Sequence, residues 1–291
     1  TFVGRLWFFG TGRELLCGNR WKRRESGHLG QSVCDAAAGP TSGAKGGGFL
    51  GLNAGVPLTP DGQICMQFGF MLLGDEDGDQ AFVTGGFYHR ANPGEDWGMN
   101  WGIVYDLMYD DFLDYQMGQL RFKAGIPITA SDELGGWFTV GNKVEQVNVT
   151  LVNQLIATPD PQFFDTIRAR VRPISQGHFF WRHVFGCGAD TSIFVGARES
   201  TGGAFMLGST ASVPINDCWA IMGGGHWSHD SDTIGSFDAY LGIALYPGGN
   251  ARVNGVCGNR YLPYQDVANN TYMPMALDPL YLQIETDKAR L

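Results

Sequence analysis

The sequence predicts an all-β protein: a single antiparallel, up-and-down transmembrane β-barrel of about twelve strands, with a long N-terminal loop and an irregular C-terminal tail. The composition, a recurrent alternation of apolar and polar residues and a repeated proline turn predict this fold. Gly accounts for 43 of the 291 residues and charged residues for only 17%, which favours short strands and tight turns over helices. No stretch approaches the roughly 18 to 20 consecutive apolar residues that a membrane-spanning helix requires, so a membrane protein with this sequence would have to cross with strands.

The alternation is clearest in two segments. In 237–246 (FDAYLGIALY) one face is apolar and the other is smaller and more polar, as expected for a strand with two different environments. In 119–126, apolar residues alternate with Gln119, Arg121 and Lys123. Since charged side chains are not left in a dry apolar core, we expect Arg121 and Lys123 to face water or a polar lumen.

Segments of about ten residues, the length with which a tilted strand crosses a bilayer, recur along the chain. They fall at 3–10, 48–58, 63–74, 80–90, 98–108, 117–128, 133–143, 177–186, 190–199, 203–214, 218–228 and 236–246. The count depends on whether 3–10 pairs with 236–246. Without that pair the sheet would have an open edge.

A turn pattern, in which a strand ends at Pro and a few polar residues reverse the chain, occurs at 56–61, 126–132 and 213–217. If these turns mark one rim, the connections at the other rim are longer on average, and they fall at 11–47, 75–79, 109–116, 144–176, 200–202 and 229–235. Short turns at one rim and long loops at the other are typical of outer-membrane barrels. Both termini should then lie at the short-turn, periplasmic rim.

We therefore expect residues 1–247 to form the barrel. Within them, 11–47 is Gly-rich and basic and lacks alternation, so it is interpreted as a long surface loop. Residues 248–291 contain several prolines and no further barrel-length segment, which indicates a C-terminal periplasmic tail that packs beneath the barrel or docks elsewhere.

Two residue types offer weaker indications. Trp side chains near strand ends are typical of interfacial girdles, and this chain has candidates at Trp97, Trp101, Trp137, Trp219 and Trp227. The six cysteines contain no CxxC pair and no metal-ligand spacing with His, which argues against a zinc site. Either they are small buried thiols, or some form disulfides, and Cys187 with Cys218 is the first pairing to test because both lie at predicted tight turns.

The chain shows no sign of catalytic machinery, and no catalytic residue, metal or cofactor is predicted. It has none of the GxSxG, HExxH, phosphate-loop or dinucleotide motifs. The net charge of −9 argues against a nucleic-acid partner, because phosphates demand clustered Lys and Arg. A lipid hydrolase with a Ser-His pair on the outer wall, or a metal site, would have to use the cluster 226–232, with His226, Ser228, His229, Asp230 and Asp232. Four carboxylates at Asp106, Asp110, Asp111 and Asp114 are interpreted as a solvated loop rather than a cation site.

Several phrases resemble an uncharacterised family of predicted outer-membrane β-barrel proteins from planctomycete bacteria. The phrases are 101–106 (WGIVYD), 176–183 (QGHFFWRH), 188–191 (GADT), 245–252 (LYPGGNAR), 258–263 (GNRYLP) and 267–270 (VANN), and the resemblance covers about 48–273. It implies a barrel in the bacterial cell envelope, with no established activity. Residues 11–47 depart from the family's strand-rich beginning.

The predicted function follows from these points: an outer-membrane β-barrel of the bacterial envelope, a structural or assembly subunit rather than an enzyme. Its partners would be the lipid bilayer and copies of itself or other envelope proteins. The alternative is a narrow general porin, because polar side chains are expected to line the lumen. The expected lumen-lining residues are Asn100, Asp106, Arg121, Lys123, Arg182 and Asp238.

Overall fold

The computed structural model describes residues 3–15, 44–60, 62–74, 79–91, 98–110, 115–143, 145–152, 164–171, 173–199, 204–230, 233–258 and 261–268. Among these residues, no helix is long and apolar enough to cross a membrane.

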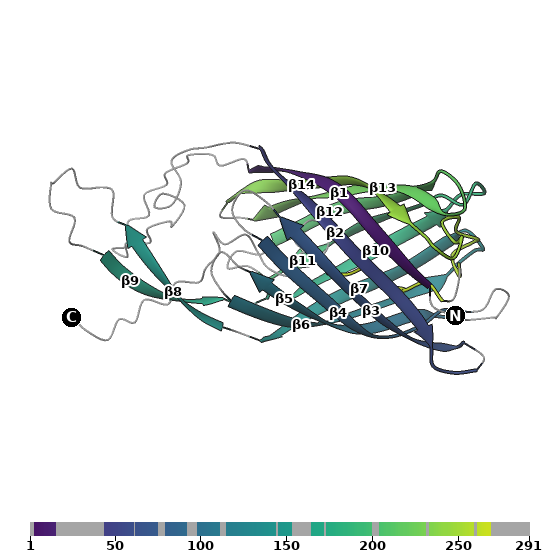
Figure 1. Cartoon of the computed structure of the whole chain (residues 1–291), viewed down its shortest axis with the longest axis horizontal. Helices are drawn as coiled ribbons and strands as arrows, with labels where there is room; N and C mark the ends of the chain where they lie inside the picture. Colours follow the sequence, from purple (N-terminus) through teal and green to yellow (C-terminus); the bar gives the residue numbers. More distant parts are fainter. Residues whose placement is uncertain are drawn as a thin grey trace.

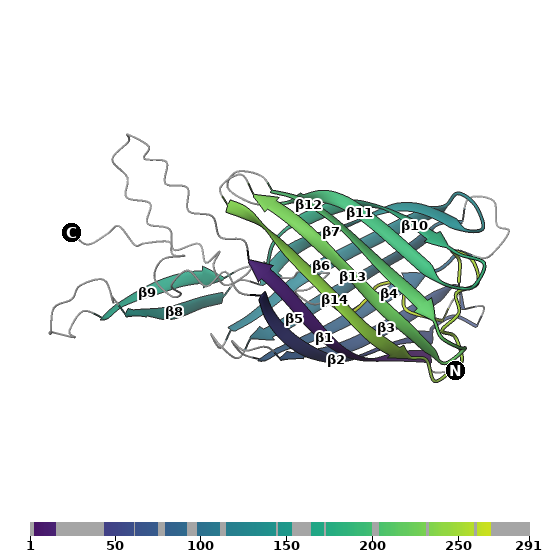
Figure 2. The same ribbon diagram turned by 90° about the horizontal axis from the view of Figure 1, so that it is seen from above.

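Twelve strands form a closed antiparallel barrel in the order β1-β14-β13-β12-β11-β10-β7-β6-β5-β4-β3-β2, and β8 and β9 pair as a separate hairpin. The barrel strands tilt strongly, and the hairpin extends beyond one end of the barrel (Figures 1 and 2). The strands are β1 (Val3–Leu15), β2 (Ala44–Pro57), β3 (Ile64–Gly74), β4 (Asp79–His89), β5 (Asn100–Asp110), β6 (Tyr115–Pro127), β7 (Asp132–Lys143), β8 (Glu145–Val152), β9 (Phe164–Val171), β10 (Gln176–Val184), β11 (Asp190–Arg198), β12 (Ala204–Pro214), β13 (Trp219–Asp230) and β14 (Thr233–Leu245).

The first strand closes the barrel. β1 pairs with β14 in a continuous register that includes Leu6 opposite Leu245 and Phe8 opposite Ile243. On its other side β1 pairs with β2, where Phe8 lies opposite Leu50. The closed sheet leaves no edge strand, which confirms the fold class predicted from the sequence.

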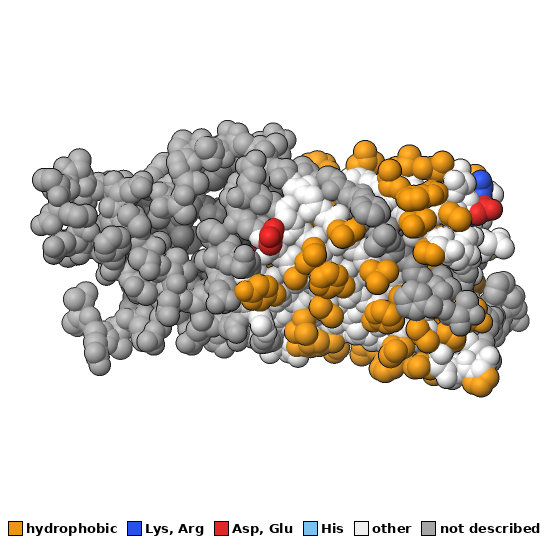
Figure 3. Space-filling view, viewed as in Figure 1, with side chains coloured by type: hydrophobic (Ala, Val, Ile, Leu, Met, Phe, Trp, Pro, Cys, Tyr) orange, Lys and Arg blue, Asp and Glu red, His pale blue; other side chains and the backbone are white. Residues whose placement is uncertain are grey.

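The barrel wall has an apolar outer face and a more polar inner face. Along β3 exposed and buried residues alternate strictly, with Met66, Phe68 and Phe70 outside and Gln67 and Met71 inside. Exposed apolar side chains recur on every barrel strand whose side chains are described, and Figure 3 shows them spread over one face of the wall. They include Leu50, Phe68, Phe70, Val83, Phe87, Ile103, Leu107, Leu120, Phe138, Val140, Phe179, Ile193, Val195, Phe205, Leu207, Ile221, Trp227, Phe237, Leu241 and Ile243.

The proline turns share one geometry. In each, the residue after Pro donates its backbone N–H to the carbonyl that begins the next strand: Leu58 to Ile64, Ile128 to Asp132 and Ile215 to Trp219, at 2.8 to 2.9 Å. Side-chain oxygens of Thr59, Thr129 and Asn216 accept further backbone N–H bonds in these turns. The three turns lie at the rim where β1 begins and β14 ends.

Two predicted loops contain strand. Residues 11–15 continue β1 and residues 44–47 begin β2, so the predicted surface loop 11–47 was too long at both ends. A backbone ladder needs no side chains, which is why the Gly-rich stretch at 46–48 can pair. The predicted loop 144–176 carries the β8–β9 hairpin. Residues 16–43 and 153–163 lie outside the described residues.

Two further expectations were wrong. Trp137 is buried inside the barrel, at 4% exposure, and does not belong to an interfacial girdle, whereas Trp219 and Trp227 are exposed on the wall. Trp101 is half-buried, and Trp97 lies outside the described residues. Cys187 and Cys218 are both free thiols, so the proposed disulfide is not formed.

Candidate functional site

The chain does not stop at the last strand but crosses the short-turn rim. Beyond β14, backbone N–H groups of the tail donate to carbonyls of three separate rim turns: Ala251 to Asp217 at 2.9 Å, Val253 to Gly188 at 3.0 Å and Val256 to Ala130 at 3.0 Å. The tail therefore ties together the β12–β13, β10–β11 and β6–β7 turns.

After Val256 the tail enters the lumen. Arg90 donates from Nε and Nη2 to the carbonyls of Leu262 and Pro263, both at 3.0 Å. Tyr264, Gln265 and Ala268 are each at most 5% exposed. Residues 261–268 thus lie within the barrel, not beneath it as expected for a periplasmic tail at 248–291, and Figure 2 shows this segment among the strands. Residues 269–291 lie outside the described residues.

Tyr264 is held by three contacts with side chains around it. Its hydroxyl donates to Glu133 Oε1 at 2.7 Å. The Lys123 ammonium lies 4.7 Å from the centre of its ring, and the Arg90 guanidinium lies 5.2 Å from it. Two cation–π contacts and a hydrogen bond to a carboxylate together fix both the ring and the hydroxyl.

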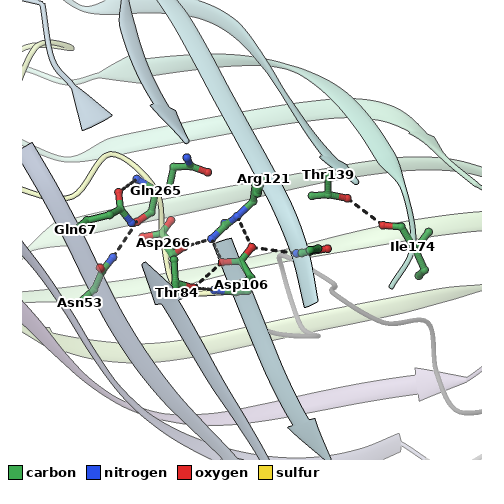
Figure 4. Close-up of polar contacts among 11 residues, drawn as sticks. Asn53, Gln67, Thr84, Asp106, Arg121, Thr139, Ile174, Gln265 and Asp266 are labelled. Carbon is green, nitrogen blue, oxygen red and sulfur yellow. Dashed lines mark hydrogen bonds and ion pairs between the residues drawn. The ribbon is translucent and has the colours of Figure 1, made fainter. Parts of the chain in front are cut away.

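The next residues bind the wall mainly through their backbone. Asn53 Nδ2 and Gln67 Nε2 donate to the carbonyl of Gln265 at 2.9 and 3.0 Å. Arg121 Nη2 donates to the carbonyl of Asp266 at 2.6 Å (Figure 4). The N–H of Ala268 donates to Thr84 Oγ1 at 3.1 Å. Side chains of the wall therefore satisfy backbone groups of an irregular segment that would otherwise be buried without partners.

Glycines on the inner wall make room for this segment. A Cβ at Gly69 would collide with Val267, and one at Gly55 would collide with the carbonyl of Tyr261. At Gly125 a Cβ would lie 2.8 Å from the Tyr264 hydroxyl, and at Gly102 it would lie 2.9 Å from Gln265 Nε2. The wall and the tail are complementary in shape as well as in hydrogen bonding.

A buried ion pair stands at the centre of this surface. Arg121 Nε and Nη2 donate to the two oxygens of Asp106 at 2.9 and 3.0 Å, and both side chains have 0% exposure. Thr84 Oγ1 and Gln119 Nε2 donate to the same carboxylate at 2.7 and 3.1 Å. The Asp106 carboxylate thus accepts four hydrogen bonds from the wall, and Arg121 Nη2 donates both to this carboxylate and to the tail.

A second polar network lies nearer the rim. Glu133 accepts from Asn100 Nδ2 at 3.0 Å and from Arg182 Nη1 at 3.3 Å. Arg182 also contacts Asp190 Oδ2 at 3.0 Å and donates to the carbonyl of Val256 in the tail at 3.2 Å. The network thus joins β5, β7, β10 and β11 to the tail.

The structure brings five of the six expected lumen residues to the tail or to its immediate supports. Arg121, Lys123 and Arg182 contact the tail directly. Asn100 and Asp106 support the residues that do so. The sixth, Asp238 on β14, lies 3.1 Å from His226 Nε2 on β13, in a separate buried pair.

The hydrolase cluster does not lie on the outer wall. His226 and Ser228 are buried inside the barrel, at 3% and 0% exposure, while His229 is exposed. The predicted pair of Ser228 with His226 therefore does not face the lipid. Of the acidic cluster, Asp110 accepts a hydrogen bond from Gln80 at 2.9 Å, and Asp111 and Asp114 lie outside the described residues. Within the described part of the chain, no group of His, Cys, Asp and Glu side chains is arranged to hold a metal ion.

Sequence reasoning missed Tyr264 and Gln265, two of the tail residues that contact the wall. A signal was present, since two phrases that carry the family resemblance, 258–263 and 267–270, flank these residues in a stretch without strand periodicity. Such phrases outside the strands indicate a segment with specific contacts of its own.

Replacing Tyr264 by Ala should loosen the tail. The change removes the hydroxyl bond to Glu133 and both cation–π contacts. We expect limited proteolysis of the detergent-solubilised protein to cut within 251–268 at least about tenfold faster, a factor that corresponds to about 1.4 kcal/mol. Tyr264→Phe keeps the ring and serves as the control, with a smaller increase. Equal cleavage of the two variants would show that the ring contacts do not hold the tail.

The closed wall, the apolar outer face and the polar inner face define the class: a β-barrel with the fold of outer-membrane proteins. A family model matches residues 30–275, and the chain belongs to this family, described as a family of unknown function, DUF6666. That match supplies neither an activity nor the planctomycete source implied by the resemblance.

Solved structures match this chain at very low sequence identity. A structure from a study of the in-meso crystallization of membrane proteins has a TM-score of 0.51 at 8% identity, covering 91% of this chain and 97% of that one. The translocator domain of the autotransporter NalP from Neisseria meningitidis has a TM-score of 0.47 at 8% identity, covering 84% and 88%. The KdgM porin has a TM-score of 0.45 at 5% identity, covering 84% and 98%. No curated protein matches the sequence.

Proposed function

We propose that this protein is a structural, non-enzymatic β-barrel of the bacterial outer membrane, whose lumen is sealed by its own tail. The observation that carries the proposal is the tail segment 261–268, which lies inside the barrel and is bound by side chains of β2, β3, β4, β6 and β7 and by Arg90 just beyond β4. An open porin needs a water-filled lumen, whereas Asn53, Gln67 and Arg121 are fully buried here.

The outer wall supports a bilayer as the surrounding medium. Exposed large apolar side chains on a monomeric soluble protein are normally scattered, and here they recur on successive strands around the wall. The fully buried pair of Arg121 and Asp106 lies on the inner face. A soluble barrel has its apolar side chains inside and its polar side chains outside. Here the distribution is reversed, as expected for a barrel that is surrounded by lipid.

Planar-bilayer recording tests the sealed-lumen function. We expect the purified full-length protein to insert and to give no stepwise current. Stable current steps from the full-length protein would favour the porin alternative, because they would require a continuous aqueous path past Tyr264 and Asp266. Insertion is checked independently by protease protection of the barrel in the same membranes.

A charge on the outer wall tests the bilayer itself. Phe70 lies near the middle of β3 and faces outward, at 42% exposure. We expect Phe70→Arg to destabilise the protein in lipid vesicles, with a free energy of unfolding smaller by about 2 to 4 kcal/mol, because an arginine would enter the hydrocarbon layer. The measurement is urea titration of vesicle-bound protein, with Leu58→Arg in the β2–β3 turn as a control that should change little. If Phe70→Arg and Leu58→Arg both change the free energy of unfolding by equally small amounts, the outer face of β3 is in water rather than in lipid.

A structural role also calls for partners in the envelope. Copies of this chain or other envelope proteins are the candidates, because a sealed barrel acts through its surfaces rather than its lumen. Native gels of the protein extracted in mild detergent test for a ring-like or smaller oligomer, and a monomer under all conditions would leave only hetero-partners.

A further inference from the structure

The outer wall has a hollow on the side of the barrel that is formed by β7, β10, β11 and β12. Its volume is about 310 Å³, which is comparable to that of a small ligand site, about 300 Å³ or more. Phe179 is 77% exposed here, and its partner in register on β7 is Gly136, which has no side chain to cover the ring. The outward side chains that line the hollow are Leu134, Phe179, Trp181, Ile193, Val195 and Leu207.

A polar cluster lies next to the hollow, on the same outward face and closer to the short-turn rim. Asp132 on β7 lies opposite His183 on β10, two residues along each strand from the pair of Leu134 and Trp181. Two residues of a strand span roughly 7 Å, so the cluster begins where the hollow ends. Trp181 joins the two parts, because it lines the hollow and donates from Nε1 to Asp132 Oδ1 at 3.1 Å.

The Asp132 carboxylate can accept a further hydrogen bond. His183 Nδ1 donates to Oδ1 at 2.8 Å, and Thr129 Oγ1 donates to Oδ2 at 2.7 Å. With the bond from Trp181, three donors from the described residues reach a group that accepts about four hydrogen bonds. The Asp132 side chain is 26% exposed, so a donor outside the barrel can reach it.

The bond to Asp132 also determines what His183 can offer. A carboxylate only accepts, so Nδ1 carries a proton, and Nε2 of the neutral imidazole keeps an acceptor lone pair. Nε2 makes no hydrogen bond to any of the described residues, and the side chain is 28% exposed. The rings of Trp181 and Phe185 lie 5.8 and 4.6 Å from the imidazole. Two acceptors, a negative charge and aromatic rings together suit a cation with N–H donors.

We infer that this part of the wall binds a phospholipid with a primary ammonium headgroup, such as phosphatidylethanolamine. The ammonium donates to Asp132 and to His183 Nε2, and one acyl chain lies in the hollow. A headgroup at the rim with its chain toward the middle of the wall matches the order of polar and apolar layers in a bilayer. The inference rests on the proposed outer-membrane function and adds a specific lipid to it.

Lipid retention by the detergent-solubilised full-length protein tests the inference. The protein is incubated with equal amounts of phosphatidylethanolamine, phosphatidylcholine and phosphatidylglycerol that carry identical acyl chains, at about pH 8, where an imidazole is neutral. Bound lipids are identified by native mass spectrometry. We expect about tenfold more phosphatidylethanolamine than either other lipid, as for one hydrogen bond to a charged group. Equal retention of phosphatidylethanolamine and phosphatidylcholine, or a preference for phosphatidylglycerol, would overturn the inference.

Single substitutions separate the two parts of the site. Asp132→Asn removes the charge and should abolish the preference among headgroups. Asp217→Asn is the matched control and should keep the preference, because Asp217 lies at the same rim but pairs with Arg252 at 3.0 Å. Ile193→Trp fills the hollow and should lower the retention of all three lipids at least about fivefold.

A heat-dependent gel shift checks that each variant is folded. A preference that survives Asp132→Asn would overturn the assignment of the ammonium to this carboxylate. Retention that Ile193→Trp leaves unchanged would overturn the assignment of the acyl chain to the hollow. The comparison of the three lipids on the unmodified protein tests the inference independently of any variant.

These outcomes are separate from those of the proposed function. A membrane barrel without this site still inserts into vesicles and retains lipids regardless of their headgroups. A wall that faces water retains none of the three lipids, and Phe70→Arg then changes the free energy of unfolding very little.

Discussion

Ending the chain after Gly249 is expected to turn a silent barrel into one that conducts ions. The truncation removes every tail residue that contacts the rim turns or the inner wall, from Ala251 to Ala268. The remaining inner wall is polar at its centre, where Asn53, Gln67 and Arg121 would become accessible to water. In planar bilayers we expect stable current steps from the truncated protein under conditions in which the full-length protein gives none.

A pair of glycine variants provides the same test without a deletion. Gly69→Val places a side chain where Val267 lies, so it should push the tail from the wall and produce intermittent current. Gly85→Val on the neighbouring strand meets nothing within 4 Å, so it should behave like the unmodified protein. A folded, truncated barrel that stays silent would mean that the tail is not what closes the lumen.

The barrel could be predicted because the patterns that define each strand lie within that strand's own stretch of sequence. Alternation along β3 or β14 reports which face each side chain occupies, and Pro marks strand ends because it cannot donate to a ladder. The need for a strand that closes the barrel could be predicted, but the pairing of β1 with β14 could not, because the two strands lie at opposite ends of the chain order.

The tail could not be predicted because its contacts have no period. Gln67 and Gln265 are separated by 198 residues, and the bonds join side chains to an irregular backbone. Alternation placed Arg121 and Lys123 inside, but it could not identify Asp106 and Tyr264 as their partners. The segment that packs against glycines 69, 102 and 125 lies far along the sequence, so the positions of these glycines do not identify it.

The error at Trp137 has a different cause. Proximity to a strand end does not determine which face of the sheet a side chain occupies. The face is determined by whether the residue is an odd or an even number of positions from a residue of known orientation. Trp137 shares its face with Glu133 and Thr139, which are buried, while Leu134 and Phe138 face outward. Applying the period of two would have placed the indole inside the barrel.

Replacing Arg121 by Met is expected to cause the largest loss of stability among single substitutions in the wall. The change leaves the Asp106 carboxylate buried without its countercharge and removes the bond to the carbonyl of Asp266. Breaking one partner of a fully buried pair costs about 3 to 5 kcal/mol. The free energy of unfolding, measured by urea titration in vesicles, should fall by about this amount.

Two comparisons decide whether the loss comes from the buried charge. The double variant Arg121→Met with Asp106→Leu removes both charges, so it should recover most of the stability, because apolar replacements of a buried pair are often neutral. Arg252→Met breaks the pair with Asp217 at the rim, where the side chains are 52% and 74% exposed, and should cost less than about 1 kcal/mol. If the double variant is as unstable as Arg121→Met, the loss comes instead from the contact with the tail, and the ion pair matters because it positions Arg121 to hold Asp266.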